Sequence, residues 1–215
     1  MDVLQSVSRQ TLKRLPNYLN YLKTLSREGN ISSPEIAKAL GLNEVQVRKD
    51  LSSVSKGGRP KIGYNVGGLI SDITTYLGYD EPNDAVIVGV GNLGRALMAY
   101  RGFEEYGLRV RAGFDSSSAL VGTDVGGKPI LPLDSLVSYC KENRVRIGII
   151  ATPATAAQDA CALLIRGGIL ALWNFAPTHI TVPEGVLVQN ENMASSLALL
   201  SKHLDELLSK EDTEI

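Results

Sequence analysis

Residues 85–94 of the chain read Ala-Val-Ile-Val-Gly-Val-Gly-Asn-Leu-Gly, and this stretch decides the fold of the larger part of the molecule. Four apolar residues typical of a buried strand lead into three glycines with the spacing G-x-G-x-x-G. The residues from Leu93 to Tyr106 then predict a mostly helical segment, with Asn92 as its N-cap. A strand, a glycine turn and a helix in this order are typical of the phosphate-binding turn of a dinucleotide-binding domain.

Each glycine of the turn has its own physical reason. The first allows the tight turn, the second lets the backbone approach a pyrophosphate, and the third lets helix and strand pack closely. The helix N-terminus then offers free N–H groups and a positive dipole end to the phosphates. We therefore expect a dinucleotide to be held by Gly89, Val90, Gly91, Asn92, Leu93 and Gly94.

The next predicted strand, Leu108–Phe114, ends at Asp115, which lies about twenty residues past Gly94, as dinucleotide-binding folds require. A carboxylate there accepts hydrogen bonds from the ribose hydroxyls of adenosine and repels a 2′-phosphate. Ser116–Ser118 offers no arginine to bind such a phosphate, so the pattern favours NAD(H) over NADP(H). Two other interpretations stay open, namely a glycine-rich turn that binds nothing and a site for another nucleotide such as coenzyme A or flavin.

The rest of the second half alternates strands and helices. Strands are predicted at Ile147–Ala151 and Ile169–Trp173, each preceded by a helix, around Ser135–Asn143 and Thr155–Arg166. Nearly continuous apolar strands separated by helices indicate an α/β fold with a parallel sheet covered on both faces. Ligands bind at the carboxyl ends of such strands, where we expect the nicotinamide pocket to be lined by Thr152, Pro153, Asn174 and Phe175.

The first half of the chain predicts short helices and a wing. Pro16 is expected in the first turn of one helix, and Ser33 is the expected N-cap of the next. Asn43 caps a third helix, Glu44–Val54, after a very short link, which is helix-turn-helix spacing. Lys56–Val66 is basic and glycine-rich and predicts a two-stranded turn, so the first half is expected to be a winged helix-turn-helix domain.

The third helix has the pattern of a recognition helix. Val47, Leu51 and Val54 fall within one arc and form the expected buried stripe, while the opposite side carries hydrogen-bond donors suited to the major groove. Arginine and lysine read guanine or bind phosphate, glutamine pairs with adenine, and valine touches a thymine methyl. Basic wing residues reach the backbone or the minor groove. The alternative is an ordinary solvated helix face. The candidate DNA-binding residues are Val45, Gln46, Arg48, Lys49 and Ser52 of the helix and Arg59 and Lys61 of the wing.

The charge balance of the 215 residues supports a division into two parts. The chain has 22 basic and 23 acidic residues, a formal net charge of -1. Residues 1–80 contain 11 basic and 7 acidic residues, a net of +4, and residues 81–215 contain 11 and 16, a net of -5. Such asymmetry is a hint of a basic interaction module joined to a different one. No apolar run is long enough to span a membrane, and residues 1–15 lack the apolar core of a signal peptide, so a cytoplasmic protein is expected.

The remaining reactive residues form no recognisable catalytic or metal-binding pattern. Cys140 and Cys161 lack metal-ligand spacing and are expected as buried thiols, and His179 and His203 are isolated. We therefore expect no metal and no catalytic residues. At the C-terminus, a narrow apolar seam can cover its own sheet or cross to a second subunit; it consists of Met193, Leu197, Leu200, Leu204 and Leu207.

With a helix-turn-helix ahead of the glycine turn, the chain resembles the bacterial Rex family of redox-sensing repressors over nearly its whole length. The motifs that carry the resemblance are Arg14–Pro16, Gln46–Ser52, Gly63–Val66, Gly89–Ala96, Phe114–Asp115, Ala151–Ala154 and Asn174–Pro177. The resemblance implies a homodimer that binds an inverted-repeat operator, with NADH loosening DNA binding and NAD+ competing with it. It further implies that the C-terminal helix is exchanged between subunits and that Tyr100 lies near the nicotinamide.

One stretch and one single residue depart from the family pattern. Ser53–Pro60 stands where the family usually has an aromatic, glycine-rich stretch. Asn192 stands where many members have an acidic residue that links the exchanged helix to Tyr100 and to an N-terminal arginine. The expected division is a winged-helix domain at residues 1–78, a Rossmann NAD(H)-binding domain at 79–191 and a dimerisation helix at 192–215. We expect cofactor binding to act on DNA through the hinge at Gly78–Asn83.

Two rival functions are considered. An NAD-dependent oxidoreductase would need a substrate domain, but only one helix follows the nucleotide-binding half, and the chain has no Tyr-x-x-x-Lys pair. A repressor that senses acyl-coenzyme A keeps the architecture and changes the ligand, and Asp115 argues against it. A DNA-binding sensor that is not an enzyme is the preferred interpretation.

Overall fold

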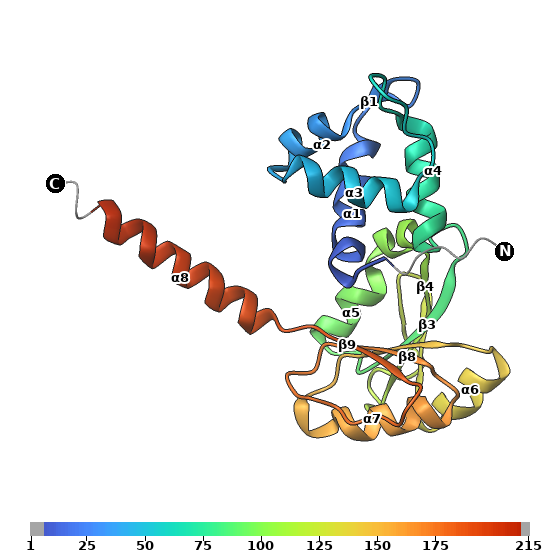
Figure 1. Ribbon diagram of the computed structural model, residues 1–215. Coiled ribbons are helices and arrows are strands. Elements are labelled where there is room, and N and C mark those ends of the chain that lie inside the picture. The colour runs from blue at the N-terminus through green and yellow to red at the C-terminus, as the bar shows by residue number, and fades with distance from the viewer. Residues whose placement is uncertain (1–6, 212–215) are drawn as a thin grey trace. The chain divides into compact units, whose positions relative to one another are not determined.

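The structure, a computed structural model, describes residues 7–211 (Figure 1). The chain divides into two compact units, Met1–Pro82 and Asn83–Ile215, so the division falls at the end of the Gly78–Asn83 linker.

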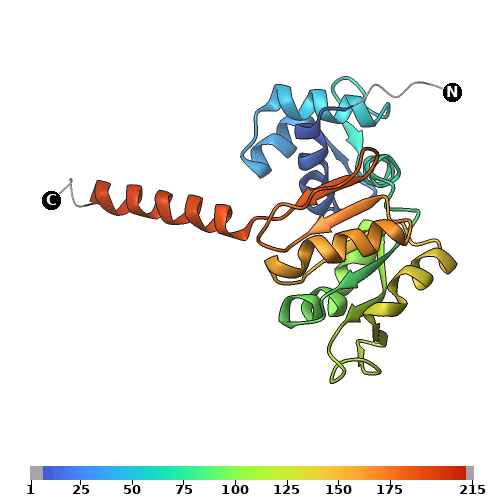
Figure 2. The ribbon, with the colours of Figure 1, turned by 90° about the horizontal axis from the view of Figure 1, so that it is seen from below.

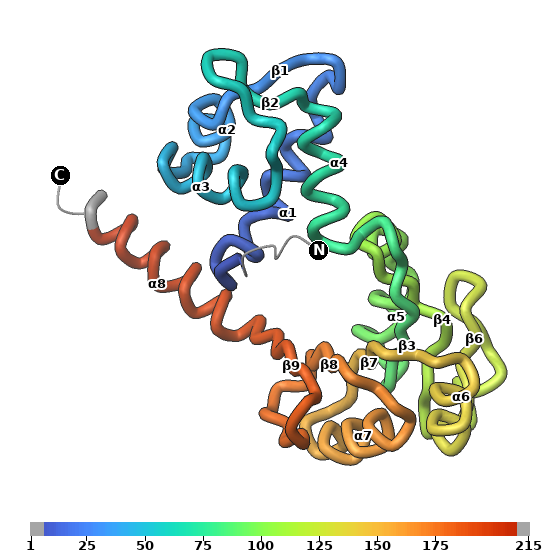
Figure 3. The backbone as a smooth tube through the Cα atoms, turned by 45° about the vertical axis from the view of Figure 1, so that its right-hand side comes forward, coloured from blue at the N-terminus to red at the C-terminus, as the bar shows by residue number. Residues whose placement is uncertain are grey.

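The first unit is a helix-turn-helix with a small sheet. Its helices pack around a core that includes Leu15, Tyr18, Leu22, Val47 and Leu51, and Figure 3 follows the chain through the tight link between the second and third helices. Gly41 ends the second helix in the left-handed conformation, at a φ of 64°, which lets the chain reverse within three residues. The elements are α1 (Arg9–Lys23), β1 (Asn30–Ile31), α2 (Ser33–Leu40), α3 (Glu44–Val54), β2 (Tyr64–Asn65) and α4 (Val66–Leu77).

The bounds of α3 and its Asn43 cap are confirmed, but two other expected helix starts are wrong. Helix α1 begins at Arg9, capped by Ser8, so Pro16 lies inside the helix rather than in its first turn. The buried face formed by Leu15, Tyr18, Leu19 and Leu22 holds the helix together across the hydrogen bond that proline cannot make. Helix α2 is capped by Ser32, not Ser33, because the Ser32 side chain and Glu35 form a reciprocal capping box.

The wing is not a two-stranded turn within Lys56–Val66. Its strand β2 pairs antiparallel with β1, and within the segment only Arg59 and Gly63 form an isolated bridge. A Cβ on Gly63 would collide with the carbonyl of Ile31, so glycine is what allows the wing to approach β1 closely. The wing is therefore a loop anchored on a strand that lies before α2.

The second unit is an α/β domain with a seven-stranded sheet in the order β5-β6-β4-β3-β7-β8-β9. All neighbours are parallel except β5 and β6. Successive strand residues point to opposite faces, where α6 and α7 cover one apolar cluster and α5 covers the other (Figure 1). The strands are β3 (Asn83–Val88), β4 (Leu108–Asp115), β5 (Asp124–Val125), β6 (Lys128–Pro132), β7 (Ile147–Ile150), β8 (Ala171–Asn174) and β9 (Leu187–Asn190). The helices are α5 (Asn92–Ala99), α6 (Leu136–Glu142) and α7 (Ala154–Arg166).

The expected long helix after the glycine turn is shorter. Helix α5 ends at Ala99, where Tyr100 leaves the helical conformation, and a 3₁₀ segment, Arg101–Tyr106, follows. The N-cap of α5 is Gly91, so Asn92 is the first residue of this helix and not its cap. The strands β5, β6 and β9 were not predicted from the sequence.

The last helix, α8 (Met193–Glu211; the red helix in Figure 2), leaves its apolar seam uncovered in the single chain. Met193, Leu197, Leu200, Leu204 and Leu207 are each more than half exposed, so this seam does not cover the sheet of its own chain. The Oδ1 atom of Asn192 accepts a hydrogen bond from Ser195 N at 3.0 Å, and Asn192 is thus the N-cap of the helix. Among the helices of residues 7–211, none is long and apolar enough to cross a membrane.

A buried carboxylate ties α3 to α1. Asp50 accepts hydrogen bonds from Arg14 Nε at 2.7 Å and Nη2 at 2.9 Å, from Tyr18 Oη at 2.8 Å and from Thr11 Oγ1 at 2.9 Å. Burial alone would raise the pKa of Asp50, but the hydrogen bonds from Arg14, Tyr18 and Thr11 outweigh it and lower that pKa. Desolvation and the Asp50 hydrogen bond raise the pKa of Tyr18 to about 12, so the phenol stays a donor.

We expect Asp50→Asn to lower the free energy of unfolding of the first unit by about 3 kcal/mol at pH 7, because it leaves Arg14 without its buried counter-charge. The folded pKa of Asp50 lies below its unfolded value of about 3.9, so its stabilisation is present above about pH 4 and is lost as the pH falls through the folded pKa. Hydrogen exchange of residues 9–77 in urea measures this unit within the full chain. Glu44→Gln, an exposed acid on the same helix, is the control and should change stability by less than about 1 kcal/mol. Equal effects of the two substitutions would contradict the assignment.

Candidate nucleotide site and candidate nucleic-acid interface

A pocket of about 600 Å³ lies at the carboxyl ends of β3, β4 and β7. Strand β3 connects to β4 on one side of it, and its other neighbour, β7, connects to β8 on the opposite side, so the connections after β3 and β7 run in opposite directions, which defines the switch point where ligands bind in open parallel sheets. The pocket brings together seven residues predicted from the sequence: Gly89, Gly91, Leu93, Asp115, Thr152, Pro153 and Phe175. It is also lined by Ala151 and Pro177, which belong to the motifs Ala151–Ala154 and Asn174–Pro177, and by Leu120 and Met193, which were not predicted.

The three glycines occupy different environments. A Cβ on Gly89, whose φ is +91°, would come within 2.8 Å of the Ala151 carbonyl, and a Cβ on Gly94 would collide with the carbonyl oxygen of Gly89. Around Gly91 a Cβ would meet nothing within 4 Å, so this residue keeps open space on the pocket side of the turn. The first and third glycines are thus needed for packing and the second leaves room for a ligand, as the spacing predicts.

Asp115 fixes the glycine turn. Its Oδ2 accepts a hydrogen bond from Val90 N at 2.7 Å, and its Oδ1 accepts one from Ser117 N at 2.9 Å. Each carboxylate oxygen has a second lone pair, so ribose hydroxyls can still donate to it from the pocket. The residue therefore shapes the turn as well as offering acceptors.

A hydroxyl of the pocket wall has no partner among the described residues. The Oγ1 atom of Thr152 is buried and makes no hydrogen bond there, although the residue lines the pocket. A buried hydroxyl without a partner is costly, and a polar atom of a ligand would satisfy it. The open space at Gly91, the acceptors of Asp115 and this hydroxyl together fit a nucleotide.

The other predicted cofactor residues do not line the pocket. Val90 and Gly94 are buried behind the turn, and Asn92 is exposed. Asn174 is fully buried; its Nδ2 donates to Thr178 O and to Asn190 Oδ1, both at 2.8 Å, and its Oδ1 accepts from Ala176 N at 3.0 Å. Asn174 thus holds the loop that carries Phe175 to the pocket.

A row of aromatic rings connects Tyr100 with the pocket. Tyr100, 53% exposed, packs edge-on against Phe103 with ring centroids 4.9 Å apart. Phe103 packs against Trp173 at 5.6 Å, and Trp173 against the pocket residue Phe175 at 4.8 Å. Trp173 Nε1 also donates to Glu191 Oε1 at 2.8 Å. Phe103, Trp173 and Glu191 were not predicted from the sequence as neighbours of the pocket. The one available signal was the two-residue spacing of Trp173 and Phe175, which places both rings on the same face of an extended segment.

Helix α3 presents the predicted DNA-reading side to solvent. Arg48, Lys49 and Ser52 are exposed, Val45 is 61% exposed, and Gln46 is half-buried. The expected buried stripe needs a correction, because Val54 is only half-buried and Asp50 is buried instead, beside Val47 and Leu51. Asp50 takes this place because its charge is compensated from α1.

In the wing, Arg59 and Lys61 are both exposed, as expected for residues that contact nucleic acid. Lys61 lies at the tip of the loop in the left-handed conformation, with a φ of 65°. This conformation costs a non-glycine residue about 1–2 kcal/mol, and such strain is often kept at functional positions.

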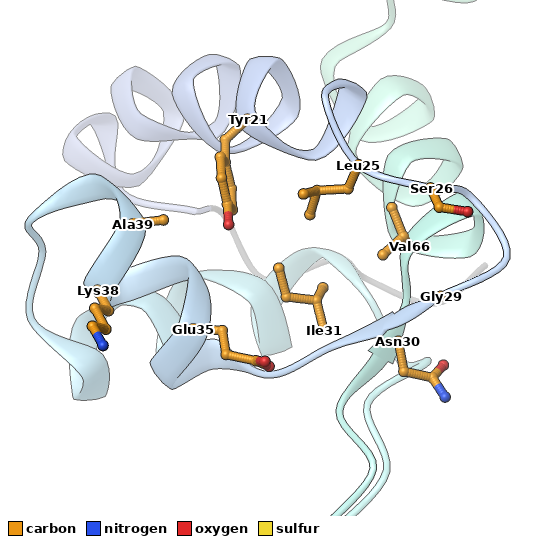
Figure 4. A pocket seen from close by; sticks show the side chains of 10 residues that line it. All are labelled: Tyr21, Leu25, Ser26, Gly29, Asn30, Ile31, Glu35, Lys38, Ala39 and Val66. Carbon is orange, nitrogen blue, oxygen red and sulfur yellow. The ribbon is translucent and has the colours of Figure 1, made fainter.

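A hollow of about 590 Å³ in the first unit has none of the predicted DNA-binding residues; the side chains of Tyr21, Leu25, Ile31 and Val66 surround it, with Glu35 and Lys38 at its edge (Figure 4).

The thiols of Cys140 and Cys161 are buried, as expected from the sequence. Burial raises the pKa of Cys140 to about 11 and that of Cys161 as well, so both stay protonated. No group of metal-ligating side chains occurs in the part of the chain that the structure describes.

The geometry defines a class: a protein that joins a winged helix-turn-helix unit to a Rossmann-type nucleotide-binding unit. Two family models agree with this division. Residues 6–52 match the family described as "Putative DNA-binding protein N-terminus", and residues 80–178 match the family described as "CoA binding domain".

Relatives over the whole chain identify the family. The redox-sensing transcriptional repressor Rex of Porphyromonas gingivalis is 40% identical over 94% of this chain and 93% of the relative. The protein of the same name from Clostridium kluyveri is 38% identical over 96% of this chain and 100% of the relative. The chain belongs to the Rex family.

Solved structures of a Rex-family repressor, RSP, have the same fold. RSP in complex with β-NAD+ and operator DNA matches with a TM-score of 0.87 and 33% identity, over 97% of this chain and 98% of that chain. RSP in complex with β-NADH matches with a TM-score of 0.85 and 33% identity, over 96% of this chain and 99% of that chain.

The glycine turn can be tested with a pair of alanine variants. Gly91→Ala should cost less than about 1 kcal/mol of stability, because its backbone conformation suits alanine and no atom lies near the new Cβ. It should nevertheless weaken NADH binding by about tenfold or more, roughly 1.4 kcal/mol, because the methyl group occupies the space left for the pyrophosphate. Gly94→Ala should instead destabilise the second unit by about 1–3 kcal/mol through its contact with Gly89. Thermal unfolding and NADH titration separate the two effects, and unchanged NADH affinity in Gly91→Ala would rule out this turn as the phosphate site.

The strained wing residue gives a second test. We expect Lys61→Gly to keep or raise stability by up to about 1 kcal/mol, because glycine removes the left-handed strain. The same substitution should weaken binding to duplex DNA and lower the slope of log K against log salt by about 1, the value for one phosphate contact. Lys141→Ala, an exposed lysine of α6, is the control. If both variants keep the wild-type salt slope, Lys61 makes no phosphate contact.

Proposed function

We propose that this protein is a transcriptional repressor that binds an inverted-repeat operator as a homodimer and releases it when NADH binds. The observation that carries the proposal is the combination in one chain of a nucleotide pocket at the switch point of the sheet and an exposed recognition helix. Family membership over nearly the whole chain supports the same function, and the protein would act in the cytoplasm, where bacterial DNA lies.

Different residues of this chain would bind the pyrophosphate, the adenosine ribose and the nicotinamide of NAD(H). The turn Gly89–Gly94 would hold the pyrophosphate at the start of α5, and Asp115 would accept from the adenosine ribose. Thr152, Pro153 and Phe175 would line the space for the nicotinamide, and Asn174 would position that wall. The nicotinamide ring is neutral when reduced and cationic when oxidised, and an apolar wall of this kind disfavours the cation.

DNA recognition would fall to α3 and the wing. Val45, Gln46, Arg48, Lys49 and Ser52 would face the major groove, and Arg59 and Lys61 would reach the backbone or the minor groove. In a dimer, the two recognition helices must lie about 34–36 Å apart to enter successive major grooves on one DNA face. The exposed seam of α8 offers the apolar surface that a second subunit would bury.

Two other functions are less well supported. An oxidoreductase would need a base or acid placed at the pocket, and its described lining offers only the carboxylate of Asp115, which already holds the turn. Coenzyme A shares the adenosine and pyrophosphate with NAD(H), which agrees with the description of the matched family. Its ribose carries a phosphate, however, and the Asp115 carboxylate would repel it.

The proposal predicts a redox-dependent release of DNA. NADH added to the protein on an A·T-rich inverted-repeat duplex should weaken DNA binding by about 5–150-fold, with NAD+ competing and NADPH inactive, and operator DNA must weaken NADH binding by the same factor. Trp173 is the single tryptophan and packs on a pocket residue, so its fluorescence should be quenched as NADH binds. Unchanged DNA affinity with every cofactor would overturn the sensor function, and turnover of a small alcohol with NAD+ would favour the enzyme.

A matched variant tests the DNA half. Arg48→Ala should weaken operator binding by at least about tenfold, because it removes a donor to guanine or phosphate, while NADH binding to the free protein stays as in the wild type. Retention of full operator affinity would show that α3 is not the recognition helix.

A further inference from the structure

Gln46 is the third residue of α3. It therefore lies near the N-terminal end of the helix, which is the end of a recognition helix that contacts base edges. From the sequence we expected it to pair with adenine. An adenine contact needs both ends of the amide, since the oxygen accepts from the N6 amino group while the nitrogen donates to N7. The surroundings of the amide oxygen therefore decide which base this residue can read.

That oxygen already has a partner within the protein. In the amide orientation in which the oxygen faces the guanidinium, Gln46 Oε1 accepts from Arg14 Nη1 at 2.9 Å and from Nη2 at 3.3 Å. The two N–H groups of Gln46 Nε2 form the end of the amide that does not contact Arg14. Gln46 is thus turned so that it offers donors rather than an acceptor to a third group.

Arg14 cannot easily turn away from this position. Its Nε and Nη2 atoms are held by the two oxygens of Asp50, whose side chain is only 4% exposed, while the Arg14 side chain is 19% exposed. Asp50 is in turn fixed by Thr11 and Tyr18. A guanidinium is a planar fork, so two bonds to Asp50 also set the direction of the remaining N–H groups toward Gln46.

We propose that Gln46 reads the major groove as a hydrogen-bond donor only, and that Asp50, acting through Arg14, is the positioning residue that sets this polarity. Guanine presents two acceptors, N7 and O6, at its major-groove edge, and adenine presents one acceptor beside an amino donor. Gln46 therefore selects guanine over adenine at its position in each half-site, with the single acceptor O4 of thymine as the weaker alternative. This inference rests on the proposed DNA-binding function and adds to it a base preference and its cause.

The test is a selection of bound sequences from duplexes whose inverted half-sites are randomised, carried out with the full-length protein. The wild type should enrich guanine at one half-site position. Gln46→Glu has the same shape and keeps an acceptor for Arg14, but it loses both donors, so guanine should be lost there by about tenfold in favour of bases with an amino donor, cytosine or adenine. The preferences at the other positions should stay unchanged. Arg48→Ala is the matched control, because it should change a different position.

A second variant separates positioning from stability. Asp50→Asn keeps the size of the side chain and weakens its hold on Arg14, so the guanine preference at the Gln46 position should relax while the preferences at the other positions remain. A merely structural role would lower affinity equally for all sequences and would remove Asp50 from the proposal. If Asp50→Asn does not fold, as hydrogen exchange would show, Gln46→Glu alone decides.

Two results would overturn the inference. Enrichment of adenine in the wild type at the position that Gln46→Glu alters would mean that the amide uses both ends. Identical preferences of the wild type and Gln46→Glu would mean that Gln46 reads no base. A wild-type protein that binds no duplex at all would overturn the proposed function itself, and this outcome is distinct from the other two.

Discussion

The carboxylate of Asp50, in the middle of α3, is buried. The geometry of the DNA-binding unit depends on how the charge of this carboxylate is compensated. All the compensation in the described contacts comes from one helix, α1, through Thr11, Arg14 and Tyr18. Four hydrogen bonds to two oxygens leave little freedom, so the rotation of α3 about its own axis is set relative to α1. An apolar residue of the same size would give comparable stability, but it would not hold Arg14 in one direction. The buried charge therefore contributes orientation rather than stability alone.

Asp115 plays a related part in the second unit, with backbone N–H groups in place of side chains. It ties Val90 in the glycine turn to Ser117 after β4, so the two loops that flank the pocket share one carboxylate. Both acids thus hold the groups that would meet a ligand, and Asp115 is the one titratable side chain in the described lining of the nucleotide pocket. This arrangement suits a protein that binds and discriminates.

The sequence predicted those features whose cause is local. The period of α3, its Asn43 cap and the spacing of Gly89–Gly94 each follow from residues within one turn or one loop, and the structure confirms them. Features whose cause is distant were missed. Asp50 interrupts an apolar stripe and looks like a surface residue until its partner Arg14, 36 positions away, is known. The wing strand pairs with the two-residue strand β1, which is too short to show a pattern. Pro16 was placed by a local rule, and the buried face of α1 overrides that rule.

The position of Asn192 shows how far the family pattern carries over to this chain. Its amide caps α8, a role that needs an acceptor but no charge, and the neighbouring Glu191 accepts from Trp173. Glu191 is thereby bonded to the aromatic row that ends at Phe175 in the pocket wall. Met193, the first residue of the helix, lines the same pocket. The start of α8 thus contacts the nucleotide site in two ways: Met193 lines the pocket, and Glu191 accepts a hydrogen bond from the Trp173 ring. Neither contact needs a charged group at position 192. Coupling through such a row requires that its rings take two packed arrangements, and Tyr100 at its far end is the most exposed of the four rings.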